Sequence, residues 1–219
     1  MSEATRARAP RRAARTPSAR RARRTHAERT AETRGKLLAA VVESIAEVGL
    51  ARTTAPEIAR RAGVTWGAVQ HHFGGKDGML VAVLDDSFQR LADRLASIPV
   101  EGTTLEERAS LFVDQAWEHL SSPHYRSTVE ILRHVTGRGR GRAGLAWRER
   151  MRRDWERIWQ RLFADARVSR AHQLVLQHYA ISLLSGLASS VLLEVGEGLR
   201  GAELALLKET LVEKLSGST

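Results

Sequence analysis

The chain contains 219 residues, of which 42% are hydrophobic and 27% are charged, as in a globular protein with one or two folded domains. It has no cysteine, which excludes disulfides, thiolate nucleophiles and cysteine-ligated zinc, and which favours a reducing, cytoplasmic location. Its formal net charge of +10 indicates a polyanionic partner, and the lack of an uninterrupted apolar run of about 20 residues argues against a membrane partner.

Residues 1–29 form an arginine-rich arm. Ten arginines stand there against Glu3 and Glu28, so the arm carries most of the net positive charge and the rest of the chain is nearly neutral. Its Arg, Ala, Thr and Pro residues show no periodicity and give it little to bury, which predicts disorder. Two interpretations stay open: a basic arm that follows DNA phosphates or enters a minor groove, and a solvated tail without a specific role.

The first helix is expected over residues 30–48. Leu37, Val41 and Ile45 recur on one face at helical spacing, and Gly49 ends the pattern. We expect this helix to support the motif that follows it.

Two short helices joined by a tight turn are predicted next. Thr54, with Glu57 three residues later, has the spacing of a capping box, in which each side chain bonds the backbone N–H of the other residue. Gly63 ends the first short helix, because a residue without a Cβ adopts the left-handed conformation at little cost. Thr65 caps the second short helix, which is expected over residues 66–72.

The two short helices have an apolar side and an outer side. The apolar residues that share one side are Ile58, Ala62, Val64, Val69 and Phe73. Trp66, Gln70 and His71 are left on the outer side. This arrangement is a helix-turn-helix, whose second helix enters the major groove of DNA.

The same stretch resembles the DNA-binding motif of the tetracycline-repressor (TetR) family of bacterial transcription regulators. The matching residues are Thr53, Thr54, Ile58, Ala59, Ala62, Gly63, Val64, Thr65, Gly67, His71, His72, Phe73 and Lys76. With the flanking helices, the resemblance covers about residues 30–91. Gln70 stands where the family most often has Tyr, and Trp66 stands where a basic residue or Pro is common. Both differences lie on the outer side, so they concern the DNA sequence that is read and not the fold.

The outer side supplies the candidate DNA contacts. The candidates for the groove are Thr65, Trp66, Gly67, Gln70 and His71, and those for the phosphates are Thr53, Thr54, His72 and Lys76. Gln70 can bond adenine through two hydrogen bonds, which discriminates between bases by about 1–3 kcal/mol. For Trp66 and His72, partial packing against the first short helix is the alternative. A symmetric dimer would place two such helices about 34–36 Å apart and predicts a palindromic operator in double-stranded DNA.

Helical spacing continues through the rest of the chain. Residues 30–76 are expected to form the DNA-binding domain and residues 77–98 a linking helix, which in the resembling family connects that domain to the remainder. Residues 99–219 are expected to be an all-helical ligand-binding and dimerisation domain. The Gly-Arg repeat at residues 137–142 is expected to be an exposed loop within it.

The last two predicted helices indicate a homodimer. The helix over residues 169–195 is apolar nearly all round, and the helix that follows carries Leu204, Leu207, Leu211 and Leu215 on one face. Too little chain remains to cover both helices, so a four-helix bundle between two copies is expected, and the resemblance implies the same interface. One large monomeric core is the alternative.

The resemblance also implies a pocket for a small-molecule effector among the C-terminal helices. The candidate lining residues are Trp117, His119, Tyr125, Glu130, Arg133, His134, Trp155, Trp159, His178 and Ser182. Their aromatic content predicts an apolar or aromatic effector. Each of these residues, taken alone, fits a core or surface position better than a place in the pocket wall.

We therefore predict an all-α homodimeric regulator that binds DNA in a sequence-specific way and represses transcription until an effector releases it. No catalytic residues, cofactor or metal site are predicted, because no nucleophile motif, phosphate-binding Gly loop or paired-histidine spacing is present. Two other classes stay open: a sequence-tolerant DNA-coating protein, favoured by the arm, and a helical enzyme in which the two-helix motif is incidental.

Overall fold

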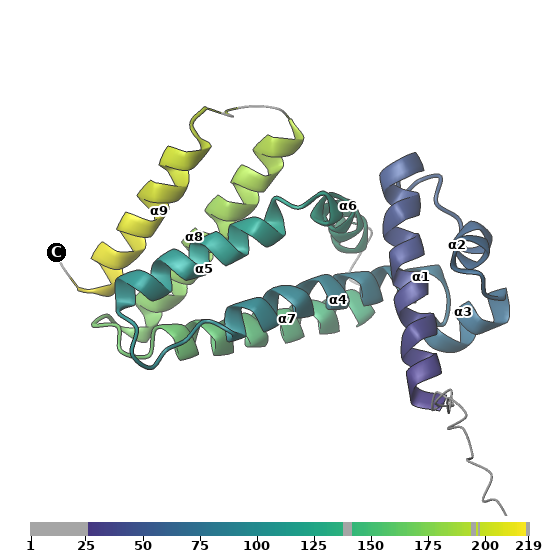
Figure 1. Ribbon diagram of the computed structural model, residues 1–219, viewed down its shortest axis with the longest axis horizontal. Coiled ribbons are helices and arrows are strands. Elements are labelled where there is room, and N and C mark those ends of the chain that lie inside the picture. Colours follow the sequence, from purple (N-terminus) through teal and green to yellow (C-terminus); the bar gives the residue numbers. More distant parts are fainter. Residues whose placement is uncertain (1–25, 138–141, 194–195, 197, 218–219) are drawn as a thin grey trace, which may run out of the picture.

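A computed structural model describes residues 26–137, 142–193, 196 and 198–217, within which the chain forms nine α-helices and no strand (Figure 1). The helices are α1 (His26–Val48), α2 (Ala55–Ala62), α3 (Trp66–Phe73), α4 (Lys76–Ala96), α5 (Leu105–Leu120), α6 (Pro123–Gly137), α7 (Arg142–Leu162), α8 (Arg170–Leu192) and α9 (Arg200–Leu215). The predicted all-α class is therefore confirmed for the described residues.

Helices α1, α2 and α3 form a head at one end of the molecule, and the start of α4 completes it (Figure 1). Apolar side chains with no solvent exposure in the head include Leu37, Val41, Ile58, Val69 and Met79. They form one core cluster, which Ile131 of α6 and Trp147 of α7 also join. Burying each large apolar side chain contributes about 1.5–3 kcal/mol, so this cluster both folds the head and fastens it to the body.

The caps of the two short helices are formed as the sequence predicts. Gly63 adopts the left-handed conformation with φ 66° and ends α2, and Gly74 does the same with φ 69° at the end of α3. The hydroxyl of Thr65 accepts a hydrogen bond from the backbone N–H of Ala68 at 3.3 Å. Both ends of α3 are thus defined by local sequence.

The capping box predicted at the start of α2 is only half formed. Thr54 accepts the backbone N–H of Glu57 at 3.4 Å, as expected. The Glu57 carboxylate does not return to Thr54 and instead accepts hydrogen bonds from Arg60 and Arg61. Two guanidinium groups one helical turn away are stronger partners for a carboxylate than one backbone N–H, which explains the difference.

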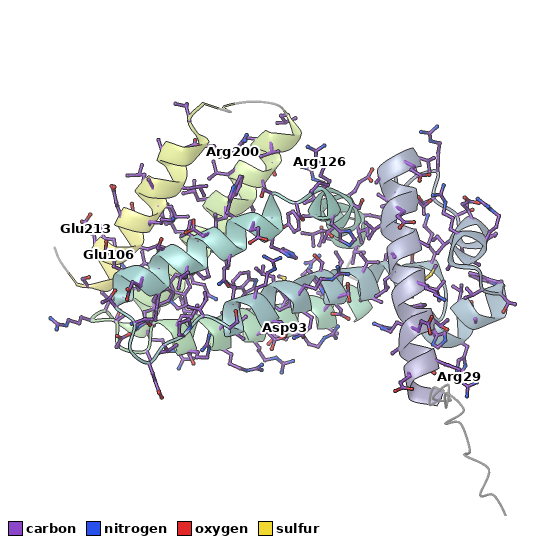
Figure 2. All side chains as sticks on the ribbon, viewed as in Figure 1. Arg29, Asp93, Glu106, Arg126, Arg200 and Glu213 are labelled. Atoms are coloured by element: carbon purple, nitrogen blue, oxygen red, sulfur yellow. The ribbon has the colours of Figure 1, made fainter. Side chains whose placement is uncertain are left out.

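Helix α4 leaves the head and runs through the body beside α7 (Figure 1). The body core also contains residues of α5, α8 and α9, and it centres on an aromatic group in which the Trp159 ring lies 5.3 Å from Phe112 and 4.7 Å from Phe163. Charged side chains such as Glu106 and Arg126 are exposed on the outside (Figure 2). The body is therefore a helical bundle through which one helix reaches directly from the head.

Two hydrogen bonds from α6 tie the body to α1. The hydroxyl of Ser127 donates to the carbonyl of Val42 at 3.1 Å, and this contact is buried. The Glu130 carboxylate accepts the backbone N–H of Leu50 at 3.3 Å, just beyond the end of α1. The head is thus held by α6 as well as by α4.

Several helix boundaries differ from those expected. Helix α1 begins at His26, four residues earlier than predicted, because Glu28 in its first turn complements the positive end of the helix dipole. Helix α6 ends at Gly137 and α7 begins at Arg142, so the first and last residues of the predicted loop are helical, and α8 ends at Leu192. The predictions for residues 1–25 of the arm and for residues 138–141 of the loop lie outside the described residues.

Helix α8 is apolar nearly all round, as expected, but it also reaches the length and hydropathy of a membrane-spanning helix, which the sequence analysis did not anticipate. Its stretch Arg170–Val191 is long and apolar enough to cross a membrane, with a mean hydropathy of 1.3, although a soluble protein's core helix can have the same composition. Only a third of that stretch is buried within this single chain. Two thirds of the stretch is therefore not buried by the other described residues.

Candidate DNA-binding surface and ligand cavity

The outer face of α3 is available to DNA. Trp66 is 46% exposed, and Gln70 and His71 are exposed beside it, whereas Val69 on the opposite face is fully buried. Thr65 and Gly67 are also exposed, so a continuous surface runs along the start of the helix. The Gln70 amide donates a hydrogen bond to the carbonyl of Gly74 at 3.2 Å, which holds the side chain along the helix.

Thr53 is not available for a phosphate, contrary to the sequence prediction. Its side chain is 1% exposed, and its hydroxyl is bonded to the Ser44 hydroxyl at 3.1 Å and to the Gly49 carbonyl at 3.0 Å. The Gly49 carbonyl also accepts the backbone N–H groups of Arg52 and Thr53, so the Thr53 hydroxyl adds a third hydrogen bond within the turn between α1 and α2. This threonine therefore holds the turn together.

Lys76 also has an internal role that the sequence did not indicate. Its ammonium group donates to the carbonyls of Thr53 at 2.5 Å and Leu50 at 3.3 Å, and the residue is half-buried. Both carbonyls belong to the same turn. Because its donors point inward, the group links the first residue of α4 to the head instead of extending toward a phosphate.

Thr54 and His72 differ in exposure. Thr54 is exposed, and its hydroxyl keeps a proton to donate while it caps α2. His72 is half-buried, and its ring lies 5.4 Å from that of His71 and 6.1 Å from that of Phe73 on the same helix. Arg34 of α1, which the sequence analysis did not single out, lies 5.1 Å from the Phe73 ring and places an exposed positive charge beside the end of α3.

The arginines of α2 are engaged with carboxylates. Glu57 accepts hydrogen bonds from Arg60 and Arg61, which lower the pKa of its carboxyl to about 2. Arg61 also bonds Glu47 of α1 at 2.6 Å, so four charged groups form one exposed network. Because its charges balance, this network contributes less to an anion-binding surface than the two arginines would alone.

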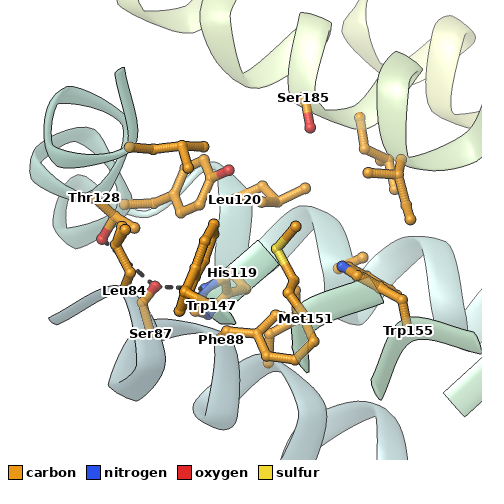
Figure 3. A pocket seen from close by; sticks show the side chains of 16 residues that line it. Leu84, Ser87, Phe88, His119, Leu120, Thr128, Trp147, Met151, Trp155 and Ser185 are labelled. Carbon is orange, nitrogen blue, oxygen red and sulfur yellow. Dashed lines mark hydrogen bonds between the residues drawn. The ribbon is translucent and has the colours of Figure 1, made fainter. Parts of the chain in front are cut away.

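A cavity of about 160 Å³ lies in the body among α4, α5, α6, α7 and α8 (Figure 3). Its apolar wall comprises Leu84, Phe88, Leu91, Ala116, Leu120, Leu132, Trp147, Met151, Trp155, Ile181 and Leu184, and its polar wall comprises Ser87, His119, Tyr125, Thr128 and Ser185. Three of the predicted lining residues, His119, Tyr125 and Trp155, are among them. The arrangement, mostly apolar with a few convergent polar groups, is that of a small-molecule site.

The other seven predicted lining residues lie outside this cavity. They are Trp117, Glu130, Arg133, His134, Trp159, His178 and Ser182. Trp159 is 2% exposed within the body core, and Trp117 packs under the guanidinium of Arg200 at 5.9 Å.

The polar residues of the same set lie in other parts of the structure. Glu130 and Arg133 line a separate open groove between α1 and α6, and His134 lies near them on α6. His178 and Ser182 are exposed on α8, where their side chains are bonded to each other at 3.4 Å. Residue type alone could not distinguish these positions from the cavity wall.

Three polar side chains meet in the cavity wall (Figure 3). Ser87 of α4 is bonded to the Nε2 atom of His119 of α5 at 3.2 Å, and Thr128 of α6 donates to the Ser87 hydroxyl at 3.5 Å. We call these three residues the polar triad. Ser87 and Thr128 were missed by the sequence analysis, because nothing local marks a serine or threonine where three helices converge.

His119 is uncharged at neutral pH. Burial lowers the pKa of its imidazole to about 4, and the positive charges of Arg94 and Arg90 act in the same direction. Burial also raises the pKa of the nearby Tyr125 hydroxyl, whose ring lies 5.7 Å from that of His119. The cavity wall therefore presents neutral hydrogen-bonding groups.

This pKa shift predicts a loss of stability in mild acid. The unfolded imidazole titrates near 6.5 and the folded one near 4, so between these values the unfolded chain binds more protons. The free energy of unfolding should fall as the pH is lowered from 6.5 to 4, by about 2 kcal/mol after allowance for the partial exposure of the ring. Urea unfolding at pH 7 and 4.5 measures this change.

His119→Gln is the control, because glutamine can bond Ser87 but does not titrate. The variant should lose less stability than the wild type over the same interval. Parallel pH profiles for the two proteins would contradict the assignment of the shift to His119.

Together, an exposed second helix that is capped at both ends, a three-helix head and a helical body with a cavity are the architecture of a helix-turn-helix protein. Within the described residues, no group of three or more His, Asp or Glu side chains is placed to hold a metal ion.

Comparison with known proteins agrees with this class. Residues 37–83 match the sequence model of bacterial regulatory proteins of the tetR family. The chain is 45% identical over 64 residues to the HTH-type transcriptional regulator BetI 2 of Chromohalobacter salexigens, covering 29% of this chain and 31% of that protein. It is 40% identical over 85 residues to BetI of Escherichia coli, covering 37% and 43%. The chain thus spans less than half the length of these curated relatives.

Solved structures extend the likeness to the fold of the body. A transcriptional regulator from Rhodococcus sp. Rha1 superposes with a TM-score of 0.67 at 18% identity, covering 84% of this chain and 97% of that one. The fatty acid degradation regulator FadR from Bacillus halodurans gives a TM-score of 0.60 at 18% identity, covering 84% and 94%. The resemblance to the TetR family is therefore confirmed, through sequence in the head and through fold across both parts.

Proposed function

We propose that this protein is a sequence-specific DNA-binding transcription regulator, a repressor that a small molecule releases from its operator. The observation that carries the proposal is the outer face of α3, where Trp66, Gln70 and His71 are exposed on a helix capped at both ends. A helix presented in this way is suited to the major groove. The match of the head to a family of regulators supports it, and gives no support to a helical enzyme.

The proposed contacts divide into base-reading and phosphate-binding groups. Thr65, Trp66, Gly67, Gln70 and His71 would face the groove. Thr54 and Arg34 would meet the phosphates, since both are exposed near the ends of the two short helices. His72 would contribute mainly by packing.

Gln70→Ala is expected to relax the base preference at one position in each half-site. A glutamine that bonds adenine through two hydrogen bonds discriminates by about 1–3 kcal/mol, and alanine cannot replace those bonds. Selection of bound fragments from a random DNA pool, done in parallel with wild type and variant, measures the preference position by position.

Arg34→Ala is the matched comparison, because a phosphate contact carries no sequence information. It should weaken binding to all DNA sequences alike. The slope of the logarithm of the binding constant against the logarithm of the salt concentration should become less steep by about 1. A loss for Gln70→Ala that is the same for every DNA sequence would count against its assignment as a base-reading residue. It would favour instead the sequence-tolerant coating protein.

We also propose that the chain acts as a homodimer through α8 and α9. Val175, Tyr179, Ser182 and Gly186 are exposed at spacings of 4, 3 and 4, which is one continuous face of α8. Leu206 of α9 is 60% exposed. An apolar stripe with small residues at one end allows another helix to approach closely, and a second copy provides such a helix by symmetry. A dimer would require a palindromic operator with two half-sites about one DNA turn, 34–36 Å, apart.

Release by an effector would act through α4. This helix lines the cavity with Leu84, Ser87 and Phe88 and begins next to the reading helix α3. A ligand that binds the cavity better in one position of α4 shifts the head toward that position. An apolar or aromatic effector would fit the mostly apolar wall of the cavity. One protein of similar fold binds a ligand with a long apolar chain: FadR of Bacillus subtilis, which has a TM-score of 0.63 at 15% identity, was solved in complex with stearoyl-CoA.

A further inference from the structure

The walls of the cavity restrict what it can bind. None of the residues that line it is Asp, Glu, Lys or Arg, and the nearest arginines are already paired on the outside, Arg90 with Asp86 and Arg94 with Glu118. A charged group brought into this space would lose its hydration without gaining a partner of opposite charge, which costs several kcal/mol. The walls therefore select against both anions and cations.

The volume of the cavity matches a ligand of about one ring. At about 160 Å³ it is close to apolar protein cavities of roughly 150 Å³ that accept a single benzene molecule. Phe88 of α4 and Trp155 of α7 have ring centroids 5.7 Å apart, and Trp147 and Met151 of α7 lie beside them (Figure 3). Aromatic rings pack favourably edge to face against such walls.

The polar triad leaves hydrogen-bonding capacity unused. The bond from Thr128 to Ser87, at 3.5 Å, is at the limit of a hydrogen bond, and the same threonine also approaches the His124 carbonyl at 3.4 Å. The Tyr125 hydroxyl, also in the wall, makes no hydrogen bond among the described residues. A group that can both donate and accept, such as a hydroxyl, would complete this set.

We propose that the effector is a neutral, single-ring aromatic molecule that carries a hydroxyl, of the phenol class, and that its hydroxyl binds at the polar triad. This inference rests on the proposed function, because it names the ligand of the regulator's cavity. Since Ser87 belongs to α4, the hydroxyl would bond the helix that begins next to α3. Recognition of the ligand and the position of the head would then involve the same residue.

The inference is tested on the full chain with phenol as the probe. Trp147 and Trp155 line the cavity, so their fluorescence reports occupancy, and calorimetry gives the stoichiometry. We expect one phenol per chain. Toluene, which has a similar shape and no hydroxyl, should bind at least tenfold more weakly, because it leaves the triad unpaired. Benzoate and benzylamine should not bind. Failure of phenol to bind, equal binding of toluene, or binding of either charged compound would overturn the inference.

Variants localise the hydroxyl. Ser87→Ala and Thr128→Val should each reduce the preference for phenol over toluene by about tenfold while toluene itself still binds, which shows that the variant is folded. Ser97→Ala, at the exposed C-terminal end of α4 and outside the cavity, is the matched control and should leave the preference for phenol over toluene unchanged. An unchanged preference in both triad variants would place the hydroxyl elsewhere.

The proposed function is tested separately by operator selection without ligand. If a specific operator is found and a different class of compound releases it, the phenol inference fails and the regulator stands. If no operator is selected, the proposed function fails whatever the cavity binds.

Discussion

Val69→Asp is expected to abolish operator binding by undocking α3 from the head. Val69 is fully buried on the inner face of that helix, between the core residues of α1 and α4. An aspartate there would bury a carboxylate with no partner, at a cost of at least about 3 kcal/mol, which is a large part of the stability of so small a unit. Operator affinity should fall by more than about 100-fold.

His71→Asp is the matched control, because it adds the same charge two residues away on the exposed face. Hydrogen exchange of the α2 and α3 amides separates the two variants: exchange should accelerate with Val69→Asp and stay as in wild type with His71→Asp. Phenol binding by the body should survive in both, since the cavity has no wall residue from α3. Equal protection of α3 in all three proteins would contradict the packing described here.

Val175→Glu combined with Leu206→Glu is expected to dissociate the dimer. The two side chains are 65% and 60% exposed on α8 and α9, so glutamate costs the isolated chain little. In a symmetric interface each substitution appears twice, and the four carboxylates would lose water and repel one another. Sedimentation should show a monomer, and affinity for a full palindrome should fall by about 10²–10⁴-fold because two heads no longer bind together.

The control places glutamates on an exposed face of α7, by Arg157→Glu and Gln160→Glu. That protein should remain dimeric. A double variant of α8 and α9 that sediments as a dimer would exclude these helices as the interface, and the apolar surface of α8 would then need another explanation.

Much of the head could be predicted because its determinants are local. Thr65, Gly63 and Gly74 act within one or two turns of their own helix, so a single sequence is enough to locate α3 and the side chains on its outer face. Thr53 and Lys76 could not be placed in the same way. The Ser44 hydroxyl that Thr53 meets and the Leu50 carbonyl that Lys76 meets lie 9 and 26 residues away in the sequence, and they come within reach only when α1 turns into α2.

The cavity was less predictable for a related reason. His119, Tyr125 and Trp155 could be chosen from residue type, but the same reasoning also chose Trp159, which is in the core, and His178, which is on the surface. Ser87 and Thr128 become a site only where α4, α5 and α6 converge, and helical periodicity does not specify which helices are neighbours. Hydrophobic periodicity predicts which face of a helix is buried, whereas the residues that line a cavity depend on how the faces of several helices pack together.

The hydrogen bonds from the Lys76 ammonium to the turn carbonyls couple α4 to the head, so that the two would move as one rigid body. With 21 residues α4 is about 30 Å long, so a tilt of about 5° about its far end carries the Lys76 end sideways by about 2–3 Å. Because the Lys76 ammonium is hydrogen-bonded to the α1–α2 turn, a tilt of α4 would displace the whole head and not α3 alone. Two heads swinging in opposite senses would change their separation by about 5 Å, more than the rise of one base pair, and would put both out of step with the grooves of a straight duplex.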